Sequence, residues 1–245
     1  MSQRVVIVGA GIGGLTAAAL LAARGFQVAL LEKERGPGGK ARRLPVGRAT
    51  VDAGPTVFTL RDVFDEIFGA CDASLDAEVR LRPAHILARH AWDAGARLDL
   101  FADPAESEAA IGDFSGVEAA RGFRAFSAEA ARIHGILDRP FMRASKAWPP
   151  QLMWRIGLHR LGALLAIRPY ETLWKALGEH FADPRLRQLF GRYATYCGSS
   201  PFACPATLML IAHVEATGVW LIEGGISALA QALARLATRH GARIR

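Results

Sequence analysis

Two short apolar runs near the start of the chain flank a longer segment rich in Ala and Leu. Residues 5–8 form a β-branched run, the pattern of a strand that is buried on both faces. The Ala/Leu-rich segment contains no proline, and a second apolar run at residues 28–31 follows it. This order predicts a strand, a helix and a second strand, which is the beginning of an α/β fold with a parallel sheet.

The uncharged stretch at residues 5–23 is also compatible with a signal peptide or a membrane anchor. Four glycines lie in its first half, however, and only one arginine precedes it. No window of the chain has the composition of a clean membrane-spanning helix, although 51% of the residues are hydrophobic. We therefore favour the interpretation as strand, helix and strand.

The middle of the chain has a different pattern. Its apolar spacing predicts a short amphipathic helix, then a β-hairpin with an Asp-Ala-Gly-Ala turn, then two helices separated by a glycine-containing break. Asp103 is expected to cap the first of these two helices, with Pro104 at its first position. The predicted elements cover residues 62–68, 85–92 with 97–101, and 103 to about 134 with the break at 112–116.

Residues 139–180 combine basic side chains with aromatic and aliphatic ones. Three of the five tryptophans lie here, and seven Lys or Arg residues face two acids, Glu171 and Glu179. The apolar residues between 152 and 167 fall near helical spacing. A basic amphipathic helix in a membrane surface and an ordinary helix pair with its arginines in water both explain this pattern.

The last part of the chain returns to an α/β pattern. Residues 218–225 have the pattern of a strand that runs into a turn, and residues 226–239 that of a helix ended by Gly241. Residues 242–245 begin another strand, which we expect in the same sheet as residues 5–8. A chain that stops where a strand begins suggests an incomplete domain.

Charge and cysteine content narrow the possible partners. The 30 Lys and Arg residues exceed the 23 Asp and Glu residues by seven, a balance that suits nucleic acid, an anionic membrane or an acidic cofactor. No nucleic-acid-binding module is visible, so we expect no nucleic-acid partner. Cys71, Cys197 and Cys204 form no CxxC pair, and the histidine spacing shows no zinc pattern, so no metal site is predicted. Cys197 and Cys204 are interpreted as small apolar residues rather than a redox pair, in a reducing, cytoplasmic setting.

The turn after the first strand reads Gly-x-Gly-x-x-Gly at Gly9, Gly11 and Gly14, with a further glycine at Gly13. In dinucleotide-binding folds the first glycine permits the tight turn, the second lets the backbone approach a pyrophosphate, and the third lets helix and strand pack closely. The helix N-terminus offers free N–H groups and the positive end of its dipole to phosphate. Glu32 ends the second strand, where a carboxylate can accept hydrogen bonds from ribose. This context predicts a dinucleotide site, with a glycine turn in another kind of α/β protein as the alternative.

Two further loops carry candidate cofactor contacts. In the first, paired glycines stand beside cations, so that N–H groups and positive charges can face phosphate. In the second, a Gly-Pro pair forces a turn and lets the backbone come near a bulky group. Either loop taken alone is also explained as a surface loop. The candidate residues are Lys33, Gly38, Gly39, Lys40 and Arg42 in the first loop, and Gly54, Pro55 and Thr56 in the second.

Taken together, the opening motif, the stretch Gly38-Gly39-Lys40-Ala41-Arg42 and the stretch Asp52-Ala53-Gly54-Pro55-Thr56 resemble the FAD-dependent carotenoid desaturases of the bacterial phytoene desaturase type. The stretches 193–201, 213–215 and 218–225 are similar to the branch that desaturates 1-hydroxycarotenoids at the 3,4 bond, the methoxyneurosporene dehydrogenases. The resemblance runs along essentially the whole chain. Family members are considerably longer and carry a second flavin-contacting motif that has no counterpart here. The chain is therefore expected to be the N-terminal part of such an enzyme, to bind flavin poorly and to be inactive by itself.

The resemblance implies FAD as the cofactor. It places the pyrophosphate over Gly9, Gly11 and Gly14, the adenosine ribose at Glu32, and the first of the two loops beside the diphosphate and ribitol. It also implies removal of two hydrogens from a C–C bond of an apolar carotenoid, with the flavin as hydride acceptor and the protein supplying orientation and a dry pocket. No catalytic residue is assigned: Asp52, His213 and Glu215 are candidate bases, and a structural role is the alternative for each.

The expected fold is a Rossmann-like FAD-binding parallel sheet with an inserted α+β substrate region. Residues 1–60 would form the first part of the FAD-binding domain, residues 61–215 the inserted substrate and membrane-associated region, and residues 216–245 the return to the FAD-binding domain. A carotenoid that resides in the bilayer favours membrane contact through residues 139–180, on the inner face of a bacterial membrane.

Four other functions remain open. They are phytoene desaturase, another flavin oxidase such as an amine oxidase, a soluble NAD-dependent dehydrogenase, and an inactive fragment. The paired-glycine loop at residues 38–40 argues against the NAD-dependent dehydrogenase, because simple nicotinamide folds do not need a second loop.

Overall fold

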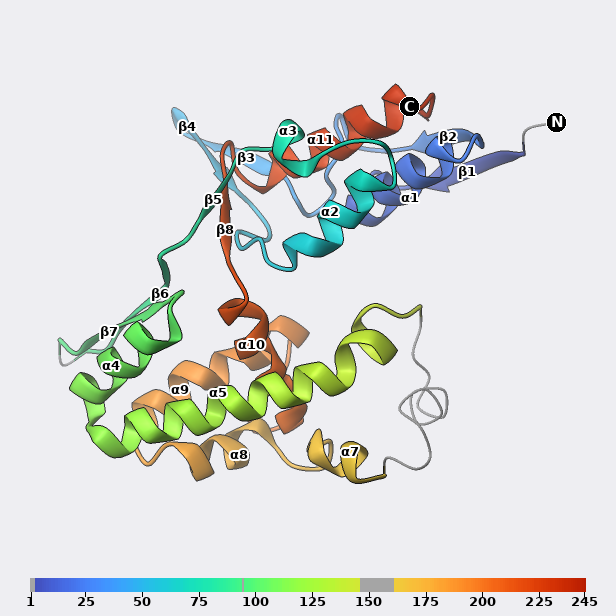
Figure 1. The fold of residues 1–245 in the computed structure, drawn as a ribbon. Helices are drawn as coiled ribbons and strands as arrows, with labels where there is room; N and C mark the ends of the chain where they lie inside the picture. Colours follow the sequence, from blue (N-terminus) through green and yellow to red (C-terminus); the bar gives the residue numbers. More distant parts are fainter. Residues whose placement is uncertain (1–2, 94, 146–160) are drawn as a thin grey trace. The chain divides into compact units, whose positions relative to one another are not determined.

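The computed structural model describes residues 3–93, 95–145 and 161–245 (Figure 1). These residues form two compact units. The first unit is discontinuous and consists of residues 1–84 and 218–245, while the second consists of residues 85–217. The chain therefore leaves the first unit, builds the second, and returns.

A three-stranded parallel sheet lies at the centre of the first unit. It contains β1 (Arg4–Val8), β2 (Gln27–Leu31) and β9 (Arg243–Ile244), in the order β1-β2-β9. The helix α1 (Ile12–Ala23) connects the first two strands. The pairing of β9 with β2 confirms that the last residues of the chain rejoin the sheet begun by the first ones.

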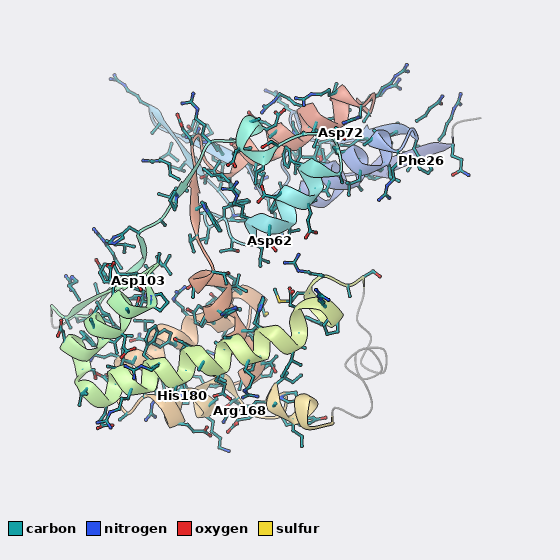
Figure 2. All side chains as sticks on the ribbon, viewed as in Figure 1. Phe26, Asp62, Asp72, Asp103, Arg168 and His180 are labelled. Atoms are coloured by element: carbon teal, nitrogen blue, oxygen red, sulfur yellow. The ribbon has the colours of Figure 1, made fainter. Side chains whose placement is uncertain are left out.

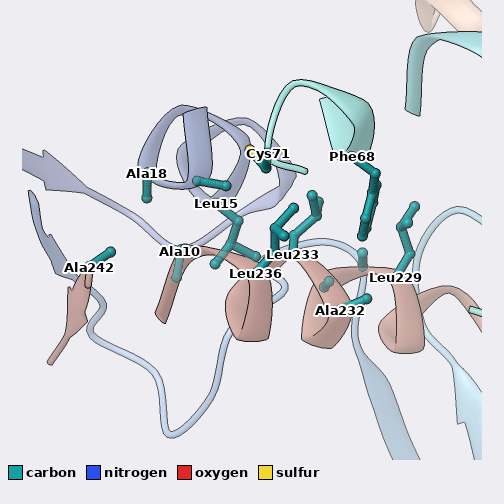
Figure 3. Packing of buried hydrophobic residues seen from close by; sticks show 14 of the residues in the cluster. Ala10, Leu15, Ala18, Phe68, Cys71, Leu229, Ala232, Leu233, Leu236 and Ala242 are labelled. Carbon is teal, nitrogen blue, oxygen red and sulfur yellow. The ribbon is translucent and has the colours of Figure 1, made fainter. Parts of the chain in front are cut away.

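The core of this unit forms where α1 packs against α11 (Ile226–Arg239) (Figure 3). Buried residues of α11 recur at helical spacing, so that one face of the helix is apolar. Leu233 and Leu236 on that face are fully buried, as are Leu15 and Ala18 of α1. The predicted helix at residues 226–239 has the bounds that the structure shows, and Gly241 follows it with a φ of +93°.

Residues 61–84 belong to the first unit, which differs from the predicted boundary after residue 60. The segment contains α2 (Arg61–Gly69), α3 (Leu75–Glu78) and β5 (Leu81–Pro83). Phe68 and Leu75 of these helices are almost completely buried in the same core as α1 and α11. An amphipathic helix predicted at residues 62–68 is thus confirmed, but its apolar face covers the nucleotide-binding core instead of starting a new region.

The remaining strands of this unit lie outside the parallel sheet. The hairpin of β3 (Arg43–Val46) and β4 (Ala49–Asp52) follows the first loop. The strand β8 (Trp220–Ile222), predicted within residues 218–225, pairs in antiparallel fashion with β5. Residues 218–245 therefore add β9 to the parallel sheet and α11 to the core of this unit. Strand β8 lies outside the parallel sheet.

The second unit is mainly helical. The hairpin of β6 (Ile86–Ala91) and β7 (Arg97–Phe101) opens it, as predicted. Asp103 caps α4 by accepting a hydrogen bond from the backbone N–H of Ala105 at 2.8 Å, and a break at Gly116 separates α4 from α5. The helical elements are α4 (Pro104–Ser115), α5 (Val117–Leu137), the π-helical turn η1 (Asp138–Met142), α7 (Leu161–Ala166), α8 (Leu173–His180), α9 (Pro184–Gly191), the 3₁₀ turns η3 (Arg192–Cys197) and η4 (Ala206–Met209), and α10 (Leu210–Ala216).

An aromatic cluster holds the helices of the second unit together. Phe126 of α5 lies with its ring centroid 4.7 Å from that of Phe190 of α9, and Phe181 stacks on Phe190 at 4.9 Å. All three side chains are almost completely buried. Among the helices that the structure describes, none has both the length and the hydropathy needed to cross a membrane.

Candidate dinucleotide site

The glycine turn between β1 and α1 has the geometry that each glycine was predicted to supply. Gly9 has a φ of +95°, a conformation that side-chain-bearing residues rarely adopt. A Cβ atom on Gly14 would overlap the carbonyl oxygen of Gly9, so the helix can approach the strand only because this residue is glycine. A Cβ atom on Gly11 would meet no protein atom within 4 Å. The space beside Gly11 is therefore open, as approach of a pyrophosphate requires.

The N-terminus of α1 is the second part of the candidate phosphate site. The helix begins at Ile12, and no side-chain hydrogen bond caps it at Gly11. Its first turn contains no acidic residue. Free N–H groups and the positive end of the helix dipole can therefore act on an anion placed beside Gly11.

Glu32 joins the end of β2 to the glycine turn. Its Oε2 atom accepts a hydrogen bond from the backbone N–H of Ala10 at 2.6 Å, and its Oε1 atom accepts one from that of Glu34 at 3.0 Å. The hydrogen bonds from Glu34 and Ala10 lower the pKa of this carboxyl group, which keeps it ionised. A carboxylate has about four acceptor positions, so the backbone donors do not fill it and it can still accept from a ribose hydroxyl. The predicted ribose contact thus fits the geometry and stays a prediction.

The paired-glycine loop packs directly on the glycine turn. The backbone N–H of Gly38 donates to the carbonyl of Ala10 at 2.8 Å, and Gly38 forms an isolated parallel bridge with Gly11. A Cβ atom on Gly39 would lie 3.1 Å from the Cα atom of Gly11. The structure therefore places the glycine turn and the paired-glycine loop together in one backbone layer. The sequence suggests each segment separately but does not show their contact.

The Gly54-Pro55 turn packs on the end of the same loop. A Cβ atom on Gly54 would overlap the carbonyl oxygen of Lys40, and the N–H of Ala53 donates to the carbonyl of Arg42 at 2.8 Å. The side chains of the candidate cations and of the turn itself remain exposed to solvent. These exposed candidates are Lys33, Lys40, Arg42, Pro55 and Thr56.

One connection that the sequence around residue 52 does not indicate joins Asp52 to the N-terminus of α11. The Oδ2 atom of Asp52 accepts a hydrogen bond from the N–H of Ile226 at 3.3 Å, and a side chain on Gly225 would overlap this carboxylate. The Oδ1 atom is buried without a hydrogen bond in the described part of the chain, and Arg43 approaches it to 4.0 Å. Asp52 therefore fixes the start of α11. This contact supports a structural role for Asp52 rather than the role of a catalytic base. The pair Gly224-Gly225 before an apolar helix was the available indication in the sequence.

Glu215, the second candidate base, lies in a buried hydrogen-bond cluster of the second unit. Arg192 donates to both of its oxygens, at 3.0 and 2.6 Å. Tyr193 donates to one oxygen at 3.0 Å and Tyr196 to the other at 2.8 Å. Burial, together with the charge of Glu215, raises the pKa of Tyr196 to about 12, so this phenol keeps its proton. With four donors on one carboxylate, Glu215 is fitted to hold η3 and α10 together.

His213, the third candidate, lies on α10 in the same unit. Its ring centroid is 4.8 Å from that of His134 on α5. Burial and the neighbouring His134 lower its pKa, which favours the neutral imidazole. His213 and Glu215 both line a cavity of about 240 Å³, whereas Asp52 belongs to the first unit. The catalytic residue therefore stays unassigned.

The predicted membrane-contact segment at residues 139–180 is partly outside the described residues, since 146–160 are not described. Several of its basic side chains have acidic partners. Arg168, which is labelled in Figure 2, forms ion pairs with Glu129, Glu171 and Glu179. Large apolar side chains are nevertheless exposed here: Phe141 is 48% exposed, Leu165 70% and Tyr170 95%.

The cysteines are free thiols. Cys71 and Cys204 are buried and Cys197 is exposed, and no disulfide joins them. Burial raises the pKa of the Cys71 and Cys204 thiols, so neither is a reactive thiolate at neutral pH.

Comparison with known proteins identifies the class of fold that carries this site. Residues 7–73 match the NAD(P)-binding Rossmann-like domain. Putrescine oxidase has the same fold along all of this chain, with a TM-score of 0.60 at 15% identity, and the match covers 51% of that chain. Cyclohexylamine oxidase from Brevibacterium oxydans matches 99% of this chain and 51% of its own, with a TM-score of 0.57 at 17% identity. The first unit is thus a Rossmann-like nucleotide-binding fold of the kind found in oxidoreductases.

The sequence relatives are more similar to this chain than these solved structures are. The hydroxyneurosporene desaturase of Rubrivivax gelatinosus is 50% identical over 245 residues, which is 100% of this chain and 47% of the relative. That of Cereibacter sphaeroides is 48% identical, over 99% of this chain and 49% of the relative. The phytoene dehydrogenase of Streptomyces griseus is 34% identical, over 99% and 47%. The chain is thus similar to carotenoid desaturases along its whole length, as the resemblance predicted, and it spans about half the length of the curated relatives it matches.

Proposed function

We propose that this chain is part of an FAD-dependent desaturase that acts on a 1-hydroxycarotenoid at its 3,4 bond in carotenoid biosynthesis. The observation that carries the proposal is the 44–50% identity to three hydroxyneurosporene desaturases along essentially the whole chain. Identity to the phytoene dehydrogenase and to the lycopene-forming phytoene desaturase is lower, at 34% and 32%. This difference favours a hydroxylated substrate over phytoene.

The backbone layer around Gly11 supports FAD as the cofactor. The N–H of Gly38 and the backbone of Gly39 pack against the glycine turn, which provides a second loop beside the predicted diphosphate position. Glu32 retains acceptor positions for a ribose. When bound, the flavin would supply the hydride-accepting chemistry. The chain's own residues would bind it through the open face at Gly11 and the N-terminus of α1, and would orient it through Glu32.

The proposal is tested with a chimera. Residues 1–245 are joined to the part of the Rubrivivax gelatinosus relative that this chain does not cover, and the chimera is produced in bacteria that make 1-hydroxyneurosporene. We expect purified chimera to carry FAD and the cells to accumulate the 3,4-desaturated product. Cells that make phytoene or neurosporene without the hydroxyl should accumulate little or no product.

Gly11→Val serves as the cofactor-site variant. A Cβ atom here meets no protein atom within 4 Å, so the protein should fold, yet the space for the pyrophosphate would be filled. Flavin content should fall to background while the thermal unfolding midpoint of the apoprotein stays within a few degrees of the parent. Normal flavin content in Gly11→Val, or turnover of phytoene in preference to the hydroxylated carotenoid, would refute the proposal.

We also propose that residues 139–180 contact the membrane that holds the carotenoid. The exposed apolar side chains Phe141, Leu165 and Tyr170 support this contact, and an apolar substrate requires access to a bilayer. The protein would then be peripheral, on the inner face of a bacterial membrane.

Flotation with anionic liposomes tests the membrane contact. We expect the chain to float with the vesicles, and the double variant Leu165→Ser/Tyr170→Ser to float several-fold less. Val117 is similarly exposed, at 65%, but lies outside the segment, so Val117→Ser is the matched control and should float like the parent. Equal flotation of all three proteins would show that another surface makes the contact.

A further inference from the structure

The second unit contains a largely apolar cavity of about 240 Å³. Residues from the β6–β7 hairpin and from helices α5, α9 and α10 line it, among them Leu87, Leu100, Phe123 and Phe190. Pockets that bury a whole drug-sized ligand usually measure about 300–1,000 Å³. The cavity is therefore large enough for the end of a long molecule but not for the whole of one.

Two neutral polar side chains of the cavity lining have no hydrogen-bond partner in the described part of the chain. They are Ser127 of α5 and His213 of α10. Other hydroxyl groups in the lining are already bonded: Ser107 donates to the carbonyl of Phe101 at 3.0 Å, and Thr217 donates to that of Val214 at 2.8 Å. Half-buried hydrogen-bonding groups without partners are costly unless a ligand or water supplies the partner.

The charges at the cavity wall are neutralised within the protein. Glu215 is the acidic residue of the lining, and Arg192 and two tyrosine hydroxyls occupy its oxygens. His213 is kept neutral by burial and by His134, so it offers one N–H donor and one nitrogen acceptor. An apolar wall with two neutral hydrogen-bonding groups and no unpaired charge among its described residues suits a neutral ligand.

We propose that this cavity binds the hydroxylated end of an apolar chain, with Ser127 and His213 as the hydrogen-bond partners of the hydroxyl group. A hydroxyl both donates and accepts, which matches a serine hydroxyl and a neutral imidazole. The identification of the ligand as the end of a 1-hydroxycarotenoid rests on the proposed function. The pair would then be specificity-determining, because a ligand without the hydroxyl leaves both groups unbonded.

The binding of two small probe molecules tests this site, and the test needs neither flavin nor turnover. The probes are a branched tertiary alcohol of about ten carbons, sized to a cavity that holds several water-sized groups, and the alkane with the same carbon skeleton. The free concentration of each is measured in the headspace above solutions of the 245-residue chain. We expect the alcohol to bind about five-fold more tightly than the alkane, as one or two net hydrogen bonds predict.

Variants assign the preference to the two residues. Ser127→Ala and His213→Phe should each reduce the alcohol-to-alkane ratio, and the double variant should bring it to one or below, because the hydroxyl of the alcohol would then be buried without a partner. His213→Gln keeps a donor and an acceptor and should restore part of the preference. Ser74, in the first unit, makes no side-chain cap hydrogen bond, so Ser74→Ala is the matched control and should keep the parental ratio.

Each result has a defined meaning. A ratio of one in the parent chain, or no binding of either probe, overturns the proposal, and so does a preference that survives the double variant. Because the ratio is measured within one protein sample, a partly unfolded variant lowers both affinities without changing it. Loss of flavin in Gly11→Val leaves this assay unchanged, so failure of the binding site and failure of the proposed function are distinguishable.

Discussion

Asp183 is a residue whose ionisation should contribute to stability. It caps α9 by accepting from the N–H of Arg185 at 2.8 Å, and the hydroxyl of Ser115 donates to its other oxygen at 2.8 Å. The guanidinium of Arg185, followed by these backbone and hydroxyl donors, holds the pKa of Asp183 at about 2 although the side chain is partly desolvated. One side chain thus connects α9 to α4.

The depressed pKa of Asp183 predicts a pH dependence. The stabilisation should be fully present above about pH 4, the pKa range of an unfolded Asp, and should be lost as the pH falls towards 2. The shift corresponds to about 2 kcal/mol, because the side chain is only 11% exposed. Urea unfolding of the parent and of Asp183→Asn should differ by about this amount at pH 6 and converge near pH 2. A difference that is constant with pH would contradict the assignment, and Arg185→Gln should raise the pKa seen by carbon NMR.

Gly11 and Gly14 provide a second residue-scale test, because their neighbours differ. Gly11 has an extended conformation, with a φ of −70°, and open space where a Cβ atom would lie. Gly14 has the carbonyl of Gly9 there. We expect Gly14→Ala to lower the free energy of unfolding by about 1–3 kcal/mol, the usual cost of overpacking, and Gly11→Ala to change it by less than about 0.5 kcal/mol. Chemical denaturation of both variants measures the difference, and equal losses would contradict it.

At the scale of elements, the length and periodicity of helices could be predicted from the sequence, whereas short long-range pairings could not. The apolar face of α11 repeats over four turns, so its bounds follow from the pattern. Strands β5 and β8 contain three residues each and pair across more than a hundred residues of chain. A run of three residues carries no decisive periodicity, and its partner depends on tertiary packing.

The candidate site likewise contains features that could be predicted from the sequence and features that could not. Gly9, Gly11 and Gly14 were recognisable because each supplies a backbone property that no other residue has. The contact of Asp52 with the N-terminus of α11 joins side chain and backbone that are far apart in sequence, and nothing local to residue 52 indicates it. The same holds for Arg192 and Glu215.

Helix α5 contains a matched pair of glycines that tests how it packs. A Cβ atom on Gly122 would overlap the carbonyl oxygen of His180 at the end of α8, whereas one on Gly135 would meet nothing within 4 Å. Gly122→Ala should therefore destabilise the second unit by about 1–3 kcal/mol by separating the two helices. Gly135→Ala should stabilise the unit by about 0.4–1 kcal/mol, since alanine is the better helix former. Thermal unfolding followed by circular dichroism distinguishes the two signs, and a loss in both variants would contradict the packing.

At the scale of the whole molecule, one face of the parallel sheet lacks a cover in the described part of the chain. Val6 is 64% exposed and Val8 85% exposed, and both lie on β1, which is an edge strand of this sheet. An apolar edge strand with unpaired backbone groups favours association.

We therefore expect the 245-residue chain to self-associate as its concentration rises, and Val6→Thr/Val8→Thr to shift the association to several-fold higher concentration. Threonine keeps the β-branched shape and removes apolar surface. Val117→Thr changes a valine of similar exposure, 65%, on α5 and should associate like the parent. Sedimentation velocity provides the measurement, and a parent chain that remains monomeric throughout would contradict the expectation.

The discontinuity of the first unit has a consequence for the order of events during synthesis. Helix α1 buries its apolar face against α11, and β2 gains its second partner from β9, yet both partners are made only after residues 85–217. At about 5–20 residues per second, translation of that segment leaves α1 without its partner for on the order of ten seconds. The continuous second unit can fold in this interval, so we expect it to become protected from proteolysis on the ribosome before the nucleotide-binding core does. A helix that waits this long with an open apolar face is a natural client for a chaperone.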